Sequence, residues 1–318
     1  MIRGKENEKI FYGPLLSRRF GCSLGVDIIP FKICSYDCIY CQLGKTTCKT
    51  IERKKYININ SVNFKKDLKN IIDENPNINY ITLAGLGEPT LNSQIGQLIH
   101  YIKEVTKIPV LILTNGSLLH VKEVINEIKD ADLIKVSFDA PDEQVFKKIN
   151  NPFNEIKFDM ILDGLGTLIS NYTGNIWLEI MLLKGINDSP DMAVKFKSVL
   201  GLVDKNKKIQ KIQINTPVRP SGTGDVLIPD EEELKYFEKQ FGEKIETIKD
   251  LKLPDADKNI SDSKIIIINL CKRRPSTLID LSNSLGLNMN HVIKCLNSLI
   301  KEKKIKFKIY NDSKYYYI

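Results

Sequence analysis

The sequence predicts an α/β protein, with a parallel sheet covered by helices and a small second domain after it. Short apolar runs of strand length alternate with segments of helical spacing over residues 24–214. That alternation is typical of parallel strands joined by helices. A polar stretch with a proline then precedes a different pattern of helices and strands. We therefore expect a main domain at residues 1–252, a linker at 253–263 and a second domain at 264–318.

Six segments of the main domain have the length and composition of strands. They are residues 24–33, 79–84, 109–113, 133–138, 176–183 and 209–214, and the residues before 24 are expected to form a lead-in. The helices expected between and after them are residues 61–73, with Ser61 as the cap, then 95–106, 121–128, 141–149, 157–169, 191–200 and 230–241.

The second domain has the pattern of three helices followed by a hairpin. The expected helices are residues 264–271, 278–285 (capped by Ser276 and ended by Gly286) and 290–301, and the expected strands are 305–310 and 314–318 around Asn311. This order resembles a winged helix-turn-helix, whose third helix can enter a DNA major groove. The exposed candidates there are Asn288, Asn290, His291 and Lys294. Such modules also bind proteins or peptides, or dimerise, and the pattern leaves these alternatives open.

The charge of the chain is concentrated in this second domain. The formal net charge is +8, and residues 258–318 hold 12 Lys/Arg against 4 Asp/Glu, which accounts for the whole excess. A basic domain beside a neutral body favours a polyanionic partner. The alternative is a Lys-rich surface that only keeps the chain solvated.

Composition and cysteine usage lead us to expect a cytoplasmic, reducing compartment. It is 42% hydrophobic and 27% charged, begins with a polar segment and has no apolar run of membrane-spanning length. Seven cysteines without a secretion signal indicate metal binding, not disulfides. Four of them are scattered and are expected to be small buried apolar residues. They are Cys22, Cys48, Cys271 and Cys295.

The other three, Cys34, Cys38 and Cys41, have the spacing C-x3-C-x2-C. Three thiolates on one short loop can each bind one iron of a [4Fe–4S] cluster, which leaves the fourth iron with an open coordination position. An open position is what catalysis requires of a metal centre. A zinc site is the alternative, but zinc ligands usually come as two pairs, and His100, His120 and His291 have no ligand spacing.

The cysteine loop, residues 34–41, and the sequence before it resemble the radical S-adenosylmethionine (radical SAM) enzymes. The segments Gly13-Pro14-Leu-Leu-Ser17-Arg18-Arg19 and Ser23-Leu-Gly25-Val-Asp27 are similar to a subgroup of Fe–S oxidoreductases related to the tRNA wybutosine-synthesis enzyme, over roughly residues 11–250. The resemblance implies a partial (β/α)6 barrel, a [4Fe–4S] cluster, SAM bound to its open iron and an electron donor such as a flavodoxin or ferredoxin. In this family an electron from the cluster cleaves SAM to methionine and a 5′-deoxyadenosyl radical, which abstracts hydrogen from a substrate.

The resemblance also implies which residues bind SAM, since ligands of such folds lie at the carboxyl ends of the strands. Gly85, Gly87 and Glu88 resemble the Gly-Gly-Glu motif that holds the amino group of SAM, with the second glycine displaced by one place. The alternative for this stretch is a plain strand-to-helix turn. Asn115 lies in a Thr-Asn-Gly turn and is equally a candidate for contact with SAM or substrate.

Further candidates follow the later strands. Ser137 and Asp139 resemble the position that contacts the SAM carboxylate or ribose. Glu179 lies among apolar residues and is expected either to bind ribose or substrate, or to pair with a lysine. Val218 is the candidate for packing against adenine, near which Tyr40 is also expected, and Arg219 is a candidate contact for an anionic substrate.

The resulting hypothesis is a radical SAM enzyme that modifies a macromolecule docked by the basic second domain. RNA is the first candidate substrate, and a peptide or protein is the second. A methyltransferase variant stays open, with Cys22 or Cys48 near the mouth of the site. A different class of protein, a DNA-binding regulator with a redox-sensing cluster, has no need of SAM-binding residues at the strand ends.

Overall fold

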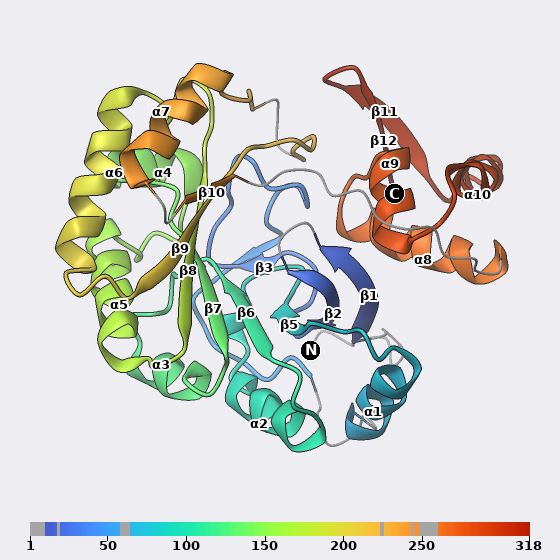
Figure 1. The fold of residues 1–318 in the computed structure, drawn as a ribbon, viewed down its shortest axis with the longest axis horizontal. Coiled ribbons are helices and arrows are strands. Elements are labelled where there is room, and N and C mark those ends of the chain that lie inside the picture. Colours follow the sequence, from blue (N-terminus) through green and yellow to red (C-terminus); the bar gives the residue numbers. More distant parts are fainter. Residues whose placement is uncertain (1–9, 18–19, 58–63, 223–225, 243–244, 248–259) are drawn as a thin grey trace.

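An eight-stranded sheet organises the main domain (Figure 1). The computed structural model describes residues 10–17, 20–57, 64–222, 226–242, 245–247 and 260–318. In sheet order the strands are β1 (Phe11–Ser17), β2 (Gly21–Asp27), β5 (Tyr80–Ala84), β6 (Val110–Thr114), β7 (Leu133–Ser137), β8 (Asn175–Met181), β9 (Ile209–Asn215) and β10 (Ile245–Thr247). β1 is antiparallel to β2, and every other neighbouring pair is parallel.

The α/β class with a parallel sheet is therefore confirmed, and the six expected strands correspond to β2 and β5–β9. The first of them was placed wrongly, because β2 ends at Asp27 and residues 28–32 form a loop. The expected lead-in contains a strand, β1, which pairs with β2 at the sheet edge. Proline cannot donate to a ladder and is tolerated at an edge, so Pro14 hid this strand from a pattern-based assignment.

The helices surround the sheet in Figure 1. They are α1 (Phe64–Glu74), α2 (Ile95–Val105), α3 (Lys122–Ile128), α4 (Glu143–Asn150), α5 (Phe158–Asn171), α6 (Pro190–Val203) and α7 (Glu231–Phe241), with a short 3-10 helix η1 (Pro89–Leu91) after β5. The expected cap Ser61 lies outside the described residues. Across the described ranges, every helix is too short or too polar to cross a membrane.

The two faces of the sheet differ in chemistry, because successive side chains of a strand point to opposite sides. The outer face is apolar: Ile81, Ile112, Ile134 and Leu178 are fully buried and belong to one core with the helices. The inner face carries polar groups on the same strands. Ser23 and Thr82 share a hydrogen bond of 2.6 Å, Lys135 pairs with Glu179, and the Lys211 ammonium lies 4.3 Å from the Trp177 ring centroid. The concave face of the sheet therefore carries side chains that suit polar ligands, and the convex face packs against the helices.

A second hydrophobic core lies in the C-terminal module, which we define as residues 260–318. It consists of α8 (Ile260–Arg273), α9 (Leu278–Leu285), α10 (Met289–Lys301) and the antiparallel pair β11 (Lys306–Tyr310) and β12 (Ser313–Tyr317). Asn311 and Asp312 both have positive φ, 44° and 56°, as a two-residue hairpin turn requires.

Two details of the module differ from the sequence prediction. Thr277, not Ser276, caps α9, because its side chain accepts from the amide of Asp280, whose carboxylate accepts from Thr277 in return. The expected linker at 253–263 is shorter at its end, since α8 already begins at Ile260. Residues 253–259 lie outside the described residues.

Candidate functional site

The cysteine loop lies at the carboxyl ends of the central strands. Cys34 ends the two-residue strand β3 (Ile33–Cys34), which pairs in parallel with β4 (Cys48–Lys49). The amide of Ile39 donates to the carbonyl of Ile149 at 2.9 Å, which fixes the loop to the end of α4. The amide of Glu88 donates to the carbonyl of Ile33 at 3.1 Å, which fixes it to the segment after β5.

Each of the three sulfurs has an N–H donor beside it. The Lys32 ammonium lies 3.2 Å from the sulfur of Cys41, and the side-chain amide of Asn150 lies 3.5 Å from that of Cys38. Cys34 receives the backbone amide of Tyr36 at 3.5 Å and the side-chain amide of Asn115 at 3.6 Å. N–H donors at sulfur stabilise the thiolate form and tune the potential of a bound cluster.

The chemistry of these donors fits an iron–sulfur cluster. Burial raises the pKa of Cys34 to about 12 and raises the pKa of Cys38 well above its usual value, and the neighbouring acids raise both further. Buried thiols of this kind ionise when a metal compensates their charge. Across the described ranges, no group of three or more His, Cys, Asp and Glu side chains is arranged to hold a metal ion as it stands.

Glu88 is buried and receives four hydrogen bonds from the protein. One carboxylate oxygen accepts from the hydroxyls of Thr90 and Thr114, both at 2.6 Å, and from the amide of Thr90 at 3.1 Å. The other oxygen accepts from the amide of Asn115 at 2.7 Å. Burial raises the pKa of Glu88, and these hydrogen bonds oppose the rise. The contacts give Glu88 a positioning role, and its contact with the amino group of SAM stays a prediction.

The two glycines before Glu88 allow a close backbone approach. A Cβ on Gly87 would lie 1.7 Å from the carbonyl oxygen of Ile33, and one on Gly85 would lie 3.1 Å from the side chain of Ile29. Only glycine fits at position 87 without moving the cysteine loop. The loop after β5 is therefore packed directly against the residue before Cys34.

Asp139, after β7, joins three parts of the site. One carboxylate oxygen accepts from the hydroxyl of Tyr40 at 2.5 Å and from the amide of Asn150 at 2.8 Å, and the other accepts from the backbone of Met181 at 3.0 Å. Burial raises the pKa of Asp139 to about 6. Asn150 thus bridges Asp139 and the sulfur of Cys38. Sequence reasoning missed Asn150, because it is the last residue of α4 and belongs to no motif with a recognisable spacing.

The structure brings most of the predicted residues together. Tyr40, Asn115 and Asp139 lie around the cysteine loop, and a small cavity there is lined in part by Tyr36, Asn115, Ser137, Asp139 and Asn150. Asn115 also donates to the hydroxyl of Ser35 at 2.9 Å. Their contacts with SAM stay predictions.

Of the two roles expected for Glu179, the structure shows the pairing with a lysine. Glu179 pairs with Lys135 of the neighbouring strand β7, and both side chains are largely buried. A buried carboxylate is costly unless an opposite charge, as here, or a set of hydrogen bonds compensates for its lost hydration. Ser137 is the register partner of Glu179, and both Lys135 and Glu179 lie two residues before the ends of their strands.

The candidates after β9 contact the C-terminal module. The carbonyl of Val218 accepts from the hydroxyl of Tyr315 at 2.6 Å, and Arg219 pairs with Asp280 at 3.3 Å, where a free contact for an anionic substrate was expected. In the module, Asn288, Asn290 and Lys294 are exposed as expected, and His291 is half-buried against Ser263.

The remaining cysteines divide into two groups. Cys271 and Cys295 are buried, as expected, and Cys22 is half-buried in β2. Cys48 is exposed, so the expectation of a buried residue was wrong there. It is the register partner of Ile33 and so lies beside the cysteine loop. A role for Cys48 in a methyltransferase reaction stays a prediction.

Comparison with known proteins decides the family. The sequence profile of the radical SAM superfamily matches residues 28–196, which include the cysteine loop, Glu88 and Asp139. The chain belongs to the radical SAM superfamily. This membership makes it a radical SAM enzyme and implies a [4Fe–4S] cluster and SAM as its cofactors. Cys34, Cys38 and Cys41 are the residues that would hold the cluster.

Relatives of this radical SAM protein span different lengths. A UPF0026 protein of Methanocaldococcus jannaschii is 31% identical over 97% of this chain and 95% of its own length. A protein of Brachyspira hyodysenteriae named GTPase Obg is 36% identical over 97% of this chain, but the chain covers only 45% of that relative. A radical SAM methyltransferase from Sphaerobacter thermophilus has the same fold at 14% identity, with a TM-score of 0.51, over 71% of this chain and 66% of that one.

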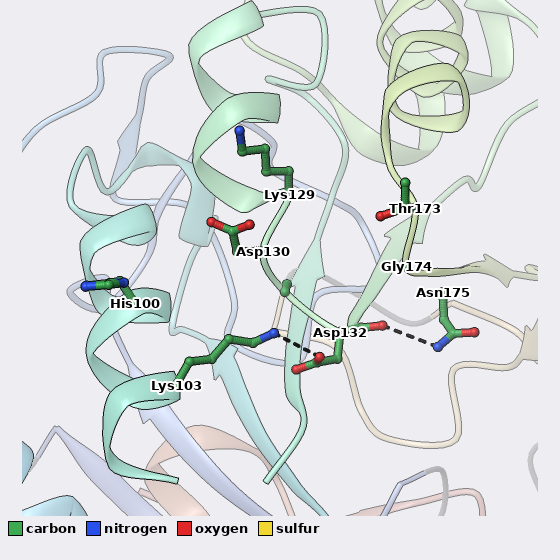
Figure 2. A pocket seen from close by; sticks show the side chains of 9 residues that line it. His100, Lys103, Lys129, Asp130, Asp132, Thr173, Gly174 and Asn175 are labelled. Atoms are coloured by element: carbon green, nitrogen blue, oxygen red, sulfur yellow. Dashed lines mark hydrogen bonds and ion pairs between the residues drawn. The ribbon is translucent and has the colours of Figure 1, made fainter. Parts of the chain in front are cut away.

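One cleft of the radical SAM protein lies away from the cysteine loop (Figure 2). Its lining includes Lys103, Asp130, Asp132 and Asn175, at the amino ends of β6–β8. Lys103 pairs with Asp132 at 2.9 Å, and both side chains are about 40% exposed. Residues at this end of such folds serve stability, and ligands bind at the opposite end. We therefore assign no catalytic role to this cleft.

Proposed function

We propose that this chain is a radical SAM enzyme that abstracts hydrogen from a macromolecular substrate, with RNA as the first candidate. When bound, the cluster supplies the electron that cleaves SAM to methionine and a 5′-deoxyadenosyl radical. The observation that carries the proposal is the set of three sulfurs, each beside an N–H donor, on one loop at the carboxyl ends of the strands.

The residues around this loop support SAM as the second ligand. Asn115, Asp139 and Val218 follow the ends of strands, Ser137 is the last residue of β7, and the inner face of the sheet beneath them is polar. A redox-sensing regulator would need the sulfurs alone. The polar groups gathered around the loop therefore favour the enzyme over the regulator.

The C-terminal module supports RNA as the substrate. We propose that residues 264–318 form a winged helix-turn-helix that docks the substrate, with residues 1–252 as the catalytic domain. Lys294, Lys301 and Lys306 are exposed, and the Lys314 ammonium lies 3.7 Å from the ring centroid of Phe307, a side chain that is 46% exposed. Exposed aromatic rings beside cations suit unstacked bases and phosphates. The proposed relationship to the tRNA wybutosine-synthesis enzyme also favours RNA.

The test of the chemistry uses the full chain, reconstituted anaerobically with iron and sulfide, with a flavodoxin or ferredoxin as the proposed electron donor. Reduced protein incubated with SAM is expected to produce 5′-deoxyadenosine. Protein that binds a cluster but produces none would support the regulator.

The test of the substrate adds cellular tRNA, or protein extract, to the same reaction with deuterium-labelled substrate pools. Transfer of deuterium from tRNA into 5′-deoxyadenosine is expected. We also expect tRNA binding to weaken steeply with salt, because lysines that neutralise phosphates release counterions. Transfer from the protein extract alone would identify a peptide or protein as the substrate.

A further inference from the structure

The loop that follows β9 contacts the last cysteine of the cluster motif. We call residues 216–222 the β9 loop. The amide of Gly222 donates to the carbonyl of Cys41 at 3.1 Å. A Cβ on Gly222 would lie 2.1 Å from the Cα of Gly44, so the two backbones are in direct contact. The position of the β9 loop is therefore tied to the position of the cysteine loop.

The C-terminal module holds the same loop from the other side. The hydroxyl of Tyr315 donates to the carbonyl of Val218 at 2.6 Å, and Asp280 of α9 pairs with Arg219 at 3.3 Å. The ammonium of Lys308 lies 3.5 Å from the carbonyl of Ser221. Lys308 and Tyr315 are register partners, so one face of the β11–β12 hairpin makes these contacts. Just beyond the loop, Tyr310 of that face donates to the carbonyl of Val226 at 2.7 Å.

The module is also fixed to the opposite edge of the sheet. Arg273 of α8 pairs with Asp27 at the end of β2, and its guanidinium lies 4.3 Å from the ring centroid of Tyr12 in β1. Figure 1 shows α8 and α9 beside β1. The module therefore connects the first strands of the sheet with the loop after the sixth core strand, and it does so through polar groups that are mostly half-buried.

We propose that the C-terminal module is a brace that holds the β9 loop in its SAM-binding conformation, with Tyr315 as the main positioning residue. This rests on the proposed function, because Val218 is the candidate for packing against adenine. A loop that is competent for only part of the time binds its ligand more weakly by that fraction. Since Tyr315 is 7% exposed, its hydrogen bond to Val218 is shielded from water.

The test compares Tyr315→Phe with Tyr317→Phe in the full-length chain. Tyr317 lies on the same strand, and its hydroxyl makes no hydrogen bond to any of the described residues. Loss of one buried hydrogen bond should raise amide exchange of the 216–222 segment about fivefold in Tyr315→Phe, with no change in Tyr317→Phe or in β6. SAM binding to reconstituted Tyr315→Phe should weaken by the fraction of time that the loop spends open, with the KM for SAM raised and kcat kept. Equal exchange of the 216–222 segment in the two variants would overturn the brace.

Removal of the Arg219–Asp280 pair gives a second measurement. Arg219→Met leaves Asp280 in place to cap α9 and should loosen the β9 loop; amide exchange of the 216–222 segment as slow as in the wild type would contradict the brace. Amide exchange does not depend on SAM. A chain that binds no SAM therefore contradicts the proposed function, while the exchange result still decides the brace.

Discussion

At the carboxyl ends of the strands Glu88 and Asp139 are almost fully buried, whereas at the amino ends Asp132 stays half-exposed at the edge of a cleft. Glu88 and Asp139 are held by hydroxyl and amide donors, and Asp132 by a lysine together with the amide of Val110. Neutral donors fix a carboxylate in one orientation without cancelling its charge. The buried acids therefore organise the cysteine loop, while the exposed pair contributes little beyond local order.

The largest difference between the two ends is expected for the sulfurs. Cys38→Ala should abolish cluster binding and 5′-deoxyadenosine formation, because the cluster would keep only two of its three thiolate ligands. Cys48→Ala is the matched control, since this exposed thiol lies beside the same loop. Iron and sulfide content after reconstitution measures both. Cluster loss in Cys48→Ala as well would mean that the ligand set is wrong.

Asp139 should make the unloaded chain less stable as the pH rises. Its folded pKa of about 6 lies above the ordinary value of 3.8, so the stability it contributes is fully present below pH 4 and is lost as the pH rises to about 6. The loss amounts to about 3 kcal/mol, at about 1.4 kcal/mol per pKa unit. Denaturant unfolding of wild type and Asp139→Asn across pH 4–7 should show this slope in the difference. Parallel curves for the two proteins would contradict a raised pKa of Asp139 in the folded chain.

Glu88→Gln should destabilise the chain by about 2 kcal/mol, because its new amide group would face the amide of Asn115, which donates to Glu88 in the wild type. Asn115 donates to Cys34 and Ser35, so cluster content should also fall. Denaturant unfolding and iron content measure the two effects. Full iron loading at normal stability would show that Glu88 does not position the loop.

The smallest effect is expected at the amino ends. Lys103→Met removes only the exposed pair with Asp132, seen in Figure 2, and should change the free energy of unfolding by less than about 1 kcal/mol. Denaturant unfolding at neutral pH measures it. A loss as large as that of Glu88→Gln would erase the contrast between the two ends.

The three sulfurs and the six core strands could be predicted from local sequence patterns. The sulfurs lie within eight residues of one another, and a spacing that short survives in any fold. Continuous apolar runs such as Val110–Thr114 predict a strand covered on both faces. The edge strand β1 was missed because its proline weakens the strand pattern, and β10 because three residues give too little pattern.

The groups that surround the sulfurs could not be predicted in this way, because they come from distant parts of the chain. Asn150 reaches Cys38 across 112 residues of sequence, and Tyr315 reaches Val218 across 97. Partners so distant are set by how strands and helices close on one another, and a periodic pattern records only which face of an element is buried. The same reason explains Glu179, since its apolar neighbours predicted burial and the sheet register supplied Lys135.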